Sequence, residues 1–183
     1  MATVQAIQRH YPHAAITWVI GRVEHSLVSD ITGVKFVVFD KNRGLKSYLD
    51  LRKQIVGKPP YDVLLQMQTS LRSNLVGGII KARRKIGFPV SKARELHRFF
   101  VSEHLPETEA FHVLDVFKHF ASGINVPNFE ALWDIPIPPS AIANISSWLN
   151  GKSGHVVISP SASNIERNWL PDRYAAIARH CSE

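Results

Sequence analysis

The chain has 183 residues, which suits one domain or one domain and part of a second. Its 45% hydrophobic and 20% charged residues are ordinary for a globular protein, and no run approaches the roughly eighteen apolar residues of a membrane span. The amino terminus lacks the basic-then-apolar order of a signal peptide. A single cysteine, Cys181, excludes an internal disulfide and favours a reducing compartment, so we expect a cytoplasmic protein.

The formal net charge of +7 points to a partner that carries phosphate. Part of that charge is concentrated in one segment, at Lys81, Arg83, Arg84, Lys85, Lys92, Arg94 and Arg98. Nucleic acid, an anionic membrane face and a phosphorylated small molecule all fit such density. Any single one of these residues also fits an ordinary solvated surface, so both interpretations stay open.

Hydrophobic periodicity predicts alternating helices and strands along the first half of the chain. Helices are expected at residues 2–11, 23–29, 45–56 and 70–80, and strands at 15–20, 35–39, 61–65 and 84–87. Gly21 closes the first strand. Gly57 and the Pro59-Pro60 pair end the third helix.

The second half is less regular. Residues 88–108 are polar, with a strand expected at 99–101, and a helix is predicted at 110–122 because Val113, Val116, Phe117 and Phe120 share one face. Residues 124–139 read as a Pro-rich connector. The last predicted elements are a helix at 139–149, a strand at 155–159 and a helix at 171–181.

This order predicts an α/β fold with a Rossmann-like, mostly parallel sheet and helices on both faces. Ligands of such sheets bind beyond the carboxyl ends of the strands, which places Gln66, Gln68, Arg72 and the loop 159–169 on one side. Both ends look cut, because the chain opens on a helix with no strand before it, and residues 153–183 are too few to bury a core. We therefore expect a piece of a larger, two-lobed protein.

The segment from residue 155 to Pro171 has the pattern of an anion site. A β-branched run is followed by a polar loop and by Pro171 at a helix start, where free N–H groups and the helix dipole favour negative charge. Ser161 and Ser163 add donors, and Arg167 adds a bidentate guanidinium. The alternative is that these residues only cap the helix, with Trp169 in the core.

Other kinds of chemistry find little support. His112 and His119 lie two helical turns apart, too far to chelate one ion, and there is no H-E-x-x-H motif or cysteine pair, so no metal site is expected. Walker, G-x-G-x-x-G and G-x-S-x-G motifs are absent, and no cofactor is predicted. The aromatic residues do not interleave with the basic run, which argues against nucleic acid as the partner.

Several segments, in this order, resemble the amino-terminal half of the lipopolysaccharide heptosyltransferase group, glycosyltransferase family 9. The resembling segments are 5–12, 16–19, 61–65, 84–88, 93–95, 159–163 and 166–169, with Gln68, Arg72, Ser73 and His112 between them. The resemblance implies a GT-B fold of two Rossmann-like lobes. Residues 1–138 would form the acceptor-side lobe without its first strand, 139–152 a connector helix, and 153–183 the first βα unit of the nucleotide-sugar lobe.

The resemblance also implies an activity, the inverting, metal-independent transfer of a heptose from an ADP-sugar to the phosphorylated inner core of lipopolysaccharide. The enzyme would work in the cytoplasm, in peripheral contact with the inner membrane. Donor diphosphate contacts fall on Ser161, Ser163 and Arg167, where many relatives carry Lys at the last position. Acceptor contacts fall on Gln68, Arg72, Arg94 and Glu95.

Two positions depart from the family pattern. Gln66 stands where an Asp is common, which puts a polar role there in doubt. The expected catalytic Asp would lie before Met1, so we expect the chain alone to be inactive. The remaining hypotheses are a basic binding module for nucleic acid or anionic lipid, and another GT-B enzyme such as a sugar-nucleotide epimerase.

Overall fold

The computed structural model describes residues 1–109, 112–127, 129–132, 134–151, 154–160, 162 and 164–181. The chain divides into two compact units, Met1–Pro136 and Ile137–Glu183.

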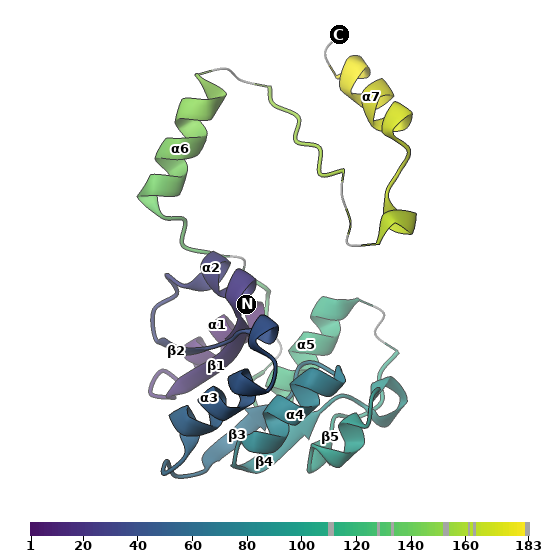
Figure 1. Cartoon of the computed structure of the whole chain (residues 1–183). Coiled ribbons are helices and arrows are strands. Elements are labelled where there is room, and N and C mark those ends of the chain that lie inside the picture. The colour runs from purple at the N-terminus through teal and green to yellow at the C-terminus, as the bar shows by residue number, and fades with distance from the viewer. Residues whose placement is uncertain are drawn as a thin grey trace. The chain divides into compact units, whose positions relative to one another are not determined.

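The first unit alternates helices and strands as the periodicity predicts (Figure 1). In chain order its elements are α1 (Ala2–His10), β1 (Ile16–Gly21), α2 (Arg22–Val28), β2 (Val34–Phe39), η1 (Lys41–Arg43), α3 (Leu45–Ile55), β3 (Tyr61–Leu65), α4 (Leu71–Ile79), β4 (Ala82–Gly87), η2 (Val90–Lys92), η3 (His97–Phe99), β5 (Glu103–His104) and α5 (Val113–Ser122).

Every strand pairing is parallel, which confirms the predicted α/β class. The strands nevertheless form two sheets within the described residues, β1-β2 and β3-β4-β5, where the sequence predicted one. Among the described strands, β1 pairs only with β2, and β3 pairs only with β4. Each of these two strands therefore has one edge without a ladder partner in the described part of the chain.

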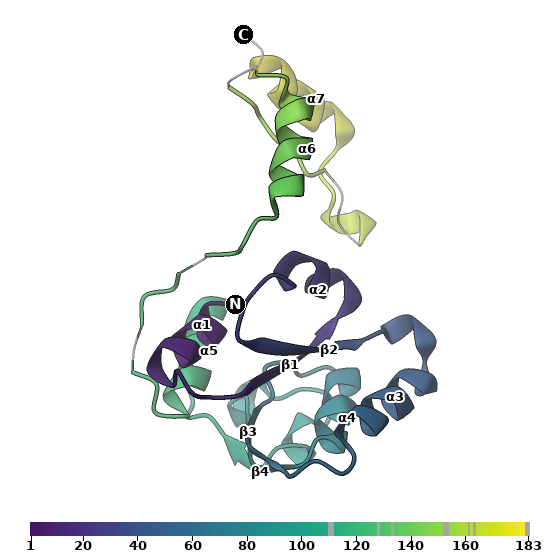
Figure 2. The same ribbon diagram turned by 90° about the vertical axis from the view of Figure 1, so that its left-hand side faces the viewer.

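Helices cover both faces of the strands, also as predicted. Figure 2 shows α1 and α5 together on one side and α3 and α4 together on the other. The Thr3 hydroxyl donates a hydrogen bond to the Phe117 carbonyl at 3.2 Å, and the Tyr11 hydroxyl donates to the Ile124 carbonyl at 2.8 Å. These bonds join α1 to α5 and to the turn after it.

The main core lies where α5 covers β4. Ile86, Leu105, Val116 and Phe120 are buried there, and Phe120 is fully buried. Its ring meets the edge of Phe88 at 5.0 Å between centroids. The carboxyl ends of β3 and β4 lie beside this core. The loops that follow these strands therefore begin at well-packed residues.

Residues 88–109 differ most from expectation within the described part of the first unit. The strand expected at 99–101 is wrong, because Phe99 belongs to η3 and the strand β5 comes later, at Glu103–His104. Leu96 has a left-handed backbone (φ 64°), which turns the chain and delays its return to the sheet. Strand β4 begins at Ala82, two residues before the predicted start at 84, and α5 begins at Val113. The predicted helix start at Ala110 lies outside the described residues.

The second unit contains α6 (Pro139–Leu149), η4 (Ile165–Arg167) and α7 (Pro171–His180), so both predicted helices are confirmed. The strand predicted at 155–159 is wrong: residues 154–160 have no regular structure, and Val157 is 90% exposed. A strand needs a neighbour to complete its hydrogen bonds, and the described part of this unit contains no other strand. Only the helix of the expected βα unit is therefore formed.

Candidate functional site

The four predicted acceptor-side residues lie at the carboxyl ends of β3 and β4. Gln68 follows β3, Arg72 stands in the first turn of α4, and Arg94 and Glu95 lie in the loop after β4. All four are exposed. The Glu95 carboxylate accepts a hydrogen bond from the Leu71 backbone N–H at the start of α4, so the structure brings this loop against the helix that carries Arg72.

Short polar side chains build the turn between β3 and α4. Ser70 is the N-cap of α4, and its hydroxyl accepts a hydrogen bond from the Ser73 N–H. The Ser73 hydroxyl donates to the carbonyl of Gln68 at 3.1 Å. Gln66 is buried, and its Nε2 donates to the Ser73 carbonyl at 2.8 Å. Gln66 thus holds the helix start in place from inside the protein.

A buried pair, Asn74 and His97, fastens the loop after β4 to α4. The Phe88 N–H donates to Nε2 of His97 at 3.1 Å, which leaves Nδ1 as the ring's donor to Oδ1 of Asn74 at 2.8 Å. The Asn74 amide donates to the Glu95 carbonyl at 2.9 Å. Burial, and secondarily the charge of His104, lowers the pKa of His97 and keeps the ring neutral.

The Asn74–His97 pair helps to hold the backbone of the loop that carries Arg94 and Glu95. Glu95 and Leu96 both have positive φ, 50° and 64°, a conformation that costs a non-glycine residue about 1–3 kcal/mol. The hydrogen bonds that Glu95 accepts from the Asn74 amide and from the Leu71 N–H offset that cost. The loop is therefore held in one shape, with Arg94 on its exposed side.

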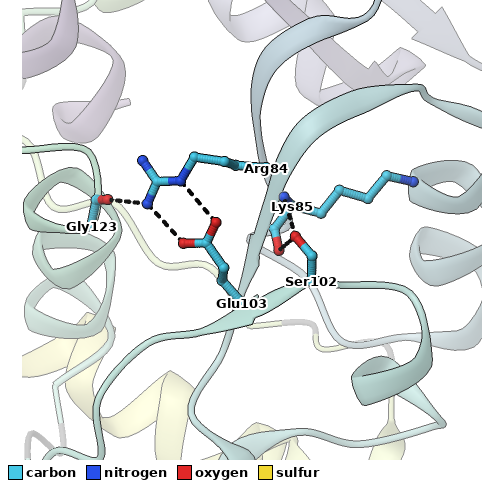
Figure 3. Close-up of polar contacts among 5 residues, drawn as sticks. All are labelled: Arg84, Lys85, Ser102, Glu103 and Gly123. Carbon is cyan, nitrogen blue, oxygen red and sulfur yellow. Dashed lines mark hydrogen bonds and ion pairs between the residues drawn. The ribbon is translucent and has the colours of Figure 1, made fainter.

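Two central residues of the basic segment are bound internally. Figure 3 shows the Arg84 guanidinium donating from Nε and Nη2 to the two carboxylate oxygens of Glu103, at 2.8 and 2.7 Å. Nη2 also donates to the Gly123 carbonyl at 3.2 Å. This pairing lowers the pKa of Glu103 and raises that of Arg84. The Lys85 ammonium donates to the Gly77 carbonyl at 2.9 Å, and burial lowers its pKa. Both side chains join structural elements, so neither supports the predicted phosphate partner.

The donor-side candidates lie in the second unit. Arg167 ends η4 and is exposed, four residues before Pro171 at the first position of α7. The turn is shaped by Asn168, whose Oδ1 accepts from the Ala162 N–H at 2.6 Å. Ser161 and Ser163 lie outside the described residues.

Trp169 is 44% exposed and meets Tyr174 edge-on at 5.5 Å, so the alternative that places it in a core is not what the structure shows. A concavity of about 350 Å³ lies elsewhere, between β2 and α3, and none of the predicted site residues lines it. The described residues contain no group of three or more metal-binding side chains. No helix in the described ranges is long and apolar enough to cross a bilayer.

The sequence profile of glycosyltransferase family 9 (heptosyltransferase) matches residues 49–183. The chain belongs to glycosyltransferase family 9. Over 178 residues it is 36% identical to the lipopolysaccharide core heptosyltransferase OpsX of Haemophilus influenzae. That match covers 97% of this family 9 chain and 51% of the relative, so the chain spans about half the length of the curated relative it matches.

Solved structures agree with the family assignment at the level of the fold. The chain resembles a family 9 glycosyl transferase of Veillonella parvula with a TM-score of 0.76 at 16% identity, covering 98% of this chain and 53% of that one. It resembles E. coli heptosyltransferase WaaC with ADP-2-deoxy-2-fluoro heptose with a TM-score of 0.69 at 17% identity, covering 100% and 60%. These likenesses confirm the Rossmann-like α/β fold that the sequence predicted.

Sequence reasoning missed the buried pair that orders the loop carrying Arg94 and Glu95 in this family 9 chain. Asn74 gave a usable signal, because it is a polar residue on the otherwise apolar, inward face of a predicted helix. His97 gave none, since it lies in a segment without periodicity. Neither residue is exposed, and both act by holding the loop that carries Arg94 and Glu95.

Proposed function

We propose that this protein is a heptosyltransferase that transfers a heptose from an ADP-sugar to the phosphorylated inner core of lipopolysaccharide, in the cytoplasm and in peripheral contact with the inner membrane. The observation that carries the proposal is the 36% identity to the core heptosyltransferase OpsX along nearly the whole chain. The ADP-sugar donor is supported by the solved WaaC structures, which hold ADP and a fluorinated ADP-heptose.

We assign the acceptor and the donor to different units of the chain. In this proposal residues 1–138 form the acceptor-side lobe, 139–152 the connector helix, and 153–183 the start of the nucleotide-sugar lobe. The acceptor-side candidates all belong to the first unit, and Arg167 belongs to the second. With this arrangement the donor and the acceptor are bound by different surfaces, which suits a transfer between two substrates.

Donor binding is assigned to Ser161, Ser163 and Arg167. Transfer with inversion leaves a diphosphate whose growing charge must be stabilised, and hydrogen bonds from a charged donor contribute about 1.5–3 kcal/mol each. Arg167 is exposed and stands just before a helix start, where backbone N–H groups add to its effect. This arrangement provides for the leaving group without a metal ion.

Acceptor binding is assigned to Gln68, Arg72, Arg94 and Glu95. Arg72 and Arg94 offer fixed positive charge to phosphate and carboxylate groups of the inner core, and both are exposed. The Glu95 carboxylate is bonded to Leu71, so its contribution is to hold Arg94 beside α4. Gln68 presents an amide next to them at the end of β3.

Titration of ADP-heptose into the chain tests the donor assignment. Arg167→Ala should weaken binding by about ten- to a hundredfold, the equivalent of one charge-assisted bond. Arg179→Ala, an exposed arginine at the far end of α7, is the matched control and should bind as the unaltered chain does. Equal affinity in the Arg167 variant would refute the assignment. Salt-dependent binding to duplex DNA, with no affinity for the ADP-sugar, would favour the basic binding module instead.

The activity itself is tested on the protein purified from its native source. It should transfer heptose from ADP-heptose to a phosphorylated inner-core acceptor, followed by the mass of the product. In that protein Arg72→Ala and Arg94→Ala should each raise KM for the acceptor, while Arg9→Ala, on α1, should not. Absence of transfer, together with epimerisation of the sugar nucleotide, would replace the proposal by another GT-B activity.

A further inference from the structure

Helix α3 has a fixed inward face. Leu51 is 2% exposed and Ser47 is 5% exposed. The Tyr48 ring meets the edge of Phe39 on β2 at 5.0 Å between centroids. These contacts seat α3 against β2, so the direction of its opposite face is determined.

That opposite face carries a row of large apolar side chains. Leu45 is 81% exposed, Leu49 is 59% exposed, and Val56, just after the helix, is 66% exposed. At about 100° per residue these positions fall within roughly 40° of one another around the helix axis. Single exposed leucines are common on protein surfaces, but an aligned row is a feature of interaction surfaces. We call Leu45, Leu49 and Val56 the α3 stripe.

Cations border the α3 stripe on both sides. By the same helical geometry Arg52 lies along one edge, and Lys46 and Lys53 lie along the other. None of these three has an ion-pair partner among the described residues. The acidic residue of the helix, Asp50, is already bound to Arg43 at 2.9 Å.

Further positive charge lies at the end of α3. Lys58 follows the helix, and the neighbouring Lys35 lowers the pKa of Lys58. An apolar row edged by Lys and Arg is the pattern of helices that lie in the headgroup region of anionic bilayers.

We propose that the α3 stripe and its bordering cations dock the protein on an anionic lipid bilayer. Leu45, Leu49 and Val56 enter the headgroup boundary, while Lys46, Arg52 and Lys53 contact lipid phosphates. The inference rests on the proposed function in one respect, since it gives the peripheral membrane contact a surface. Helix α4, which carries Arg72, packs beside α3 (Figure 1).

Two other occupants fit the surface less well. A second copy of the chain would bring the same cations against each other, which costs free energy at each like-charged contact. Nucleic acid would neutralise the cations but would leave the α3 stripe exposed to water, because a phosphate backbone offers it no apolar contact. A bilayer satisfies both features together.

Flotation of the full 183-residue chain with lipid vesicles tests the proposal. Vesicles of phosphatidylethanolamine and phosphatidylglycerol should bind the chain, and vesicles of phosphatidylcholine alone should bind it far more weakly. Binding should fall as salt is raised. Each cation near an anionic surface is worth about a fivefold change in partitioning, so Lys46→Gln, Arg52→Gln and Lys53→Gln combined should reduce binding on the order of a hundredfold.

The α3 stripe is tested separately by Leu45→Ser combined with Leu49→Ser, which should reduce binding at least about tenfold. Matched controls on other elements are Val23→Ser with Leu27→Ser on α2, both as exposed, and Arg9→Gln with Lys81→Gln and Arg179→Gln for charge. All substituted positions are exposed, and circular dichroism checks that each variant folds.

Equal losses in the control and α3 variants would overturn the proposal, and so would binding to neither vesicle. Concentration-dependent dimers abolished by the stripe variant would assign this surface to a second copy. Tighter binding to duplex DNA than to anionic vesicles would assign it to nucleic acid. The vesicles contain neither ADP-sugar nor acceptor, so failure here leaves the transferase test untouched, and failure of that test leaves membrane docking standing.

Discussion

Phe120 is the residue on which the core of the first unit depends most. Its side chain extends from α5, is fully buried and packs against the ring of Phe88. Phe120→Ala removes most of that buried ring and leaves a cavity, so the free energy of unfolding should fall by about 3–5 kcal/mol. Phe99→Ala is the control, because Phe99 is 67% exposed and its loss should change stability much less. Urea denaturation of both variants checks the difference, and similar losses would contradict the described core.

His97 should make stability depend on pH. Burial lowers its pKa in the folded chain below the ordinary value of 6.5, so the unfolded chain takes up a proton that the folded chain does not. The contribution of neutral His97 is therefore present above pH 6.5 and is lost as the pH falls below it, by at most about 1.4 kcal/mol per pH unit.

The check is the free energy of unfolding measured between neutral and mildly acidic pH. His97→Gln should flatten the decline in that range, since the substituted side chain does not titrate. His13→Gln, at an exposed position, should leave the decline as it is in the unaltered chain. A decline of the same steepness in all three proteins would show that His97 is not its source.

In helix α4, position 77 favours glycine because a neighbouring side chain occupies the space that a Cβ would fill. A Cβ added at Gly77 would clash with Oε1 of Gln66, and Gln66 is buried and bonded to Ser73. Gly77→Ala should therefore destabilise the chain by roughly 1 kcal/mol or more, although alanine favours a helix by about that amount. A Cβ added at Gly78 would meet the ring of Phe100 at 3.1 Å, on a partly exposed side chain that can move aside by rotation, so Gly78→Ala should be neutral or stabilising.

A double-mutant cycle isolates the cause. In a Gln66→Ala background the added methyl has room, so Gly77→Ala should cost less there than in the unaltered chain. Thermal unfolding of the four proteins gives the coupling. Additive effects would mean that the clash with Gln66 is not what keeps this position a glycine.

The elements of the first unit could largely be predicted, because α3, α4 and α5 each bury one helical face and β1 and β2 are β-branched runs ended by glycine or a polar turn. Strand β5 could not, since it has two residues and is positioned by partners far along the chain, Arg84 and Phe88, rather than by its own pattern. The rule on strand ends placed Gln68 and Arg72 beyond β3, where the structure has them, whereas the acceptor role of these residues and of Arg94 and Glu95 came from the family resemblance and stays a prediction. The Asn74–His97 pair could not be predicted, because its members are separated by 23 residues and share no motif.

For the molecule as a whole, the same β-branched pattern gave opposite results in the two units. Residues 35–39 form β2 because β1 lies beside them to complete the ladder. Residues 155–159 contain more β-branched residues than residues 35–39, but no strand lies beside them in the described part of their unit, and neither α6 nor α7 has a buried residue. Local preference fixes an extended backbone, whereas a strand also requires a partner.

Hydrogen exchange distinguishes these two situations directly. Amides of Val156, Val157 and Ile158 should exchange at close to the rates of an unfolded peptide, because no ladder hydrogen bond or burial protects them. Amides of β4, which pairs on both sides with β3 and β5 at its carboxyl end, should exchange orders of magnitude more slowly. Mass spectrometry of peptic fragments covering 154–160 and 82–87 measures both in one sample. Protection of the first fragment comparable to the second would mean that residues 155–159 are paired in solution, and would restore the strand that the sequence predicted.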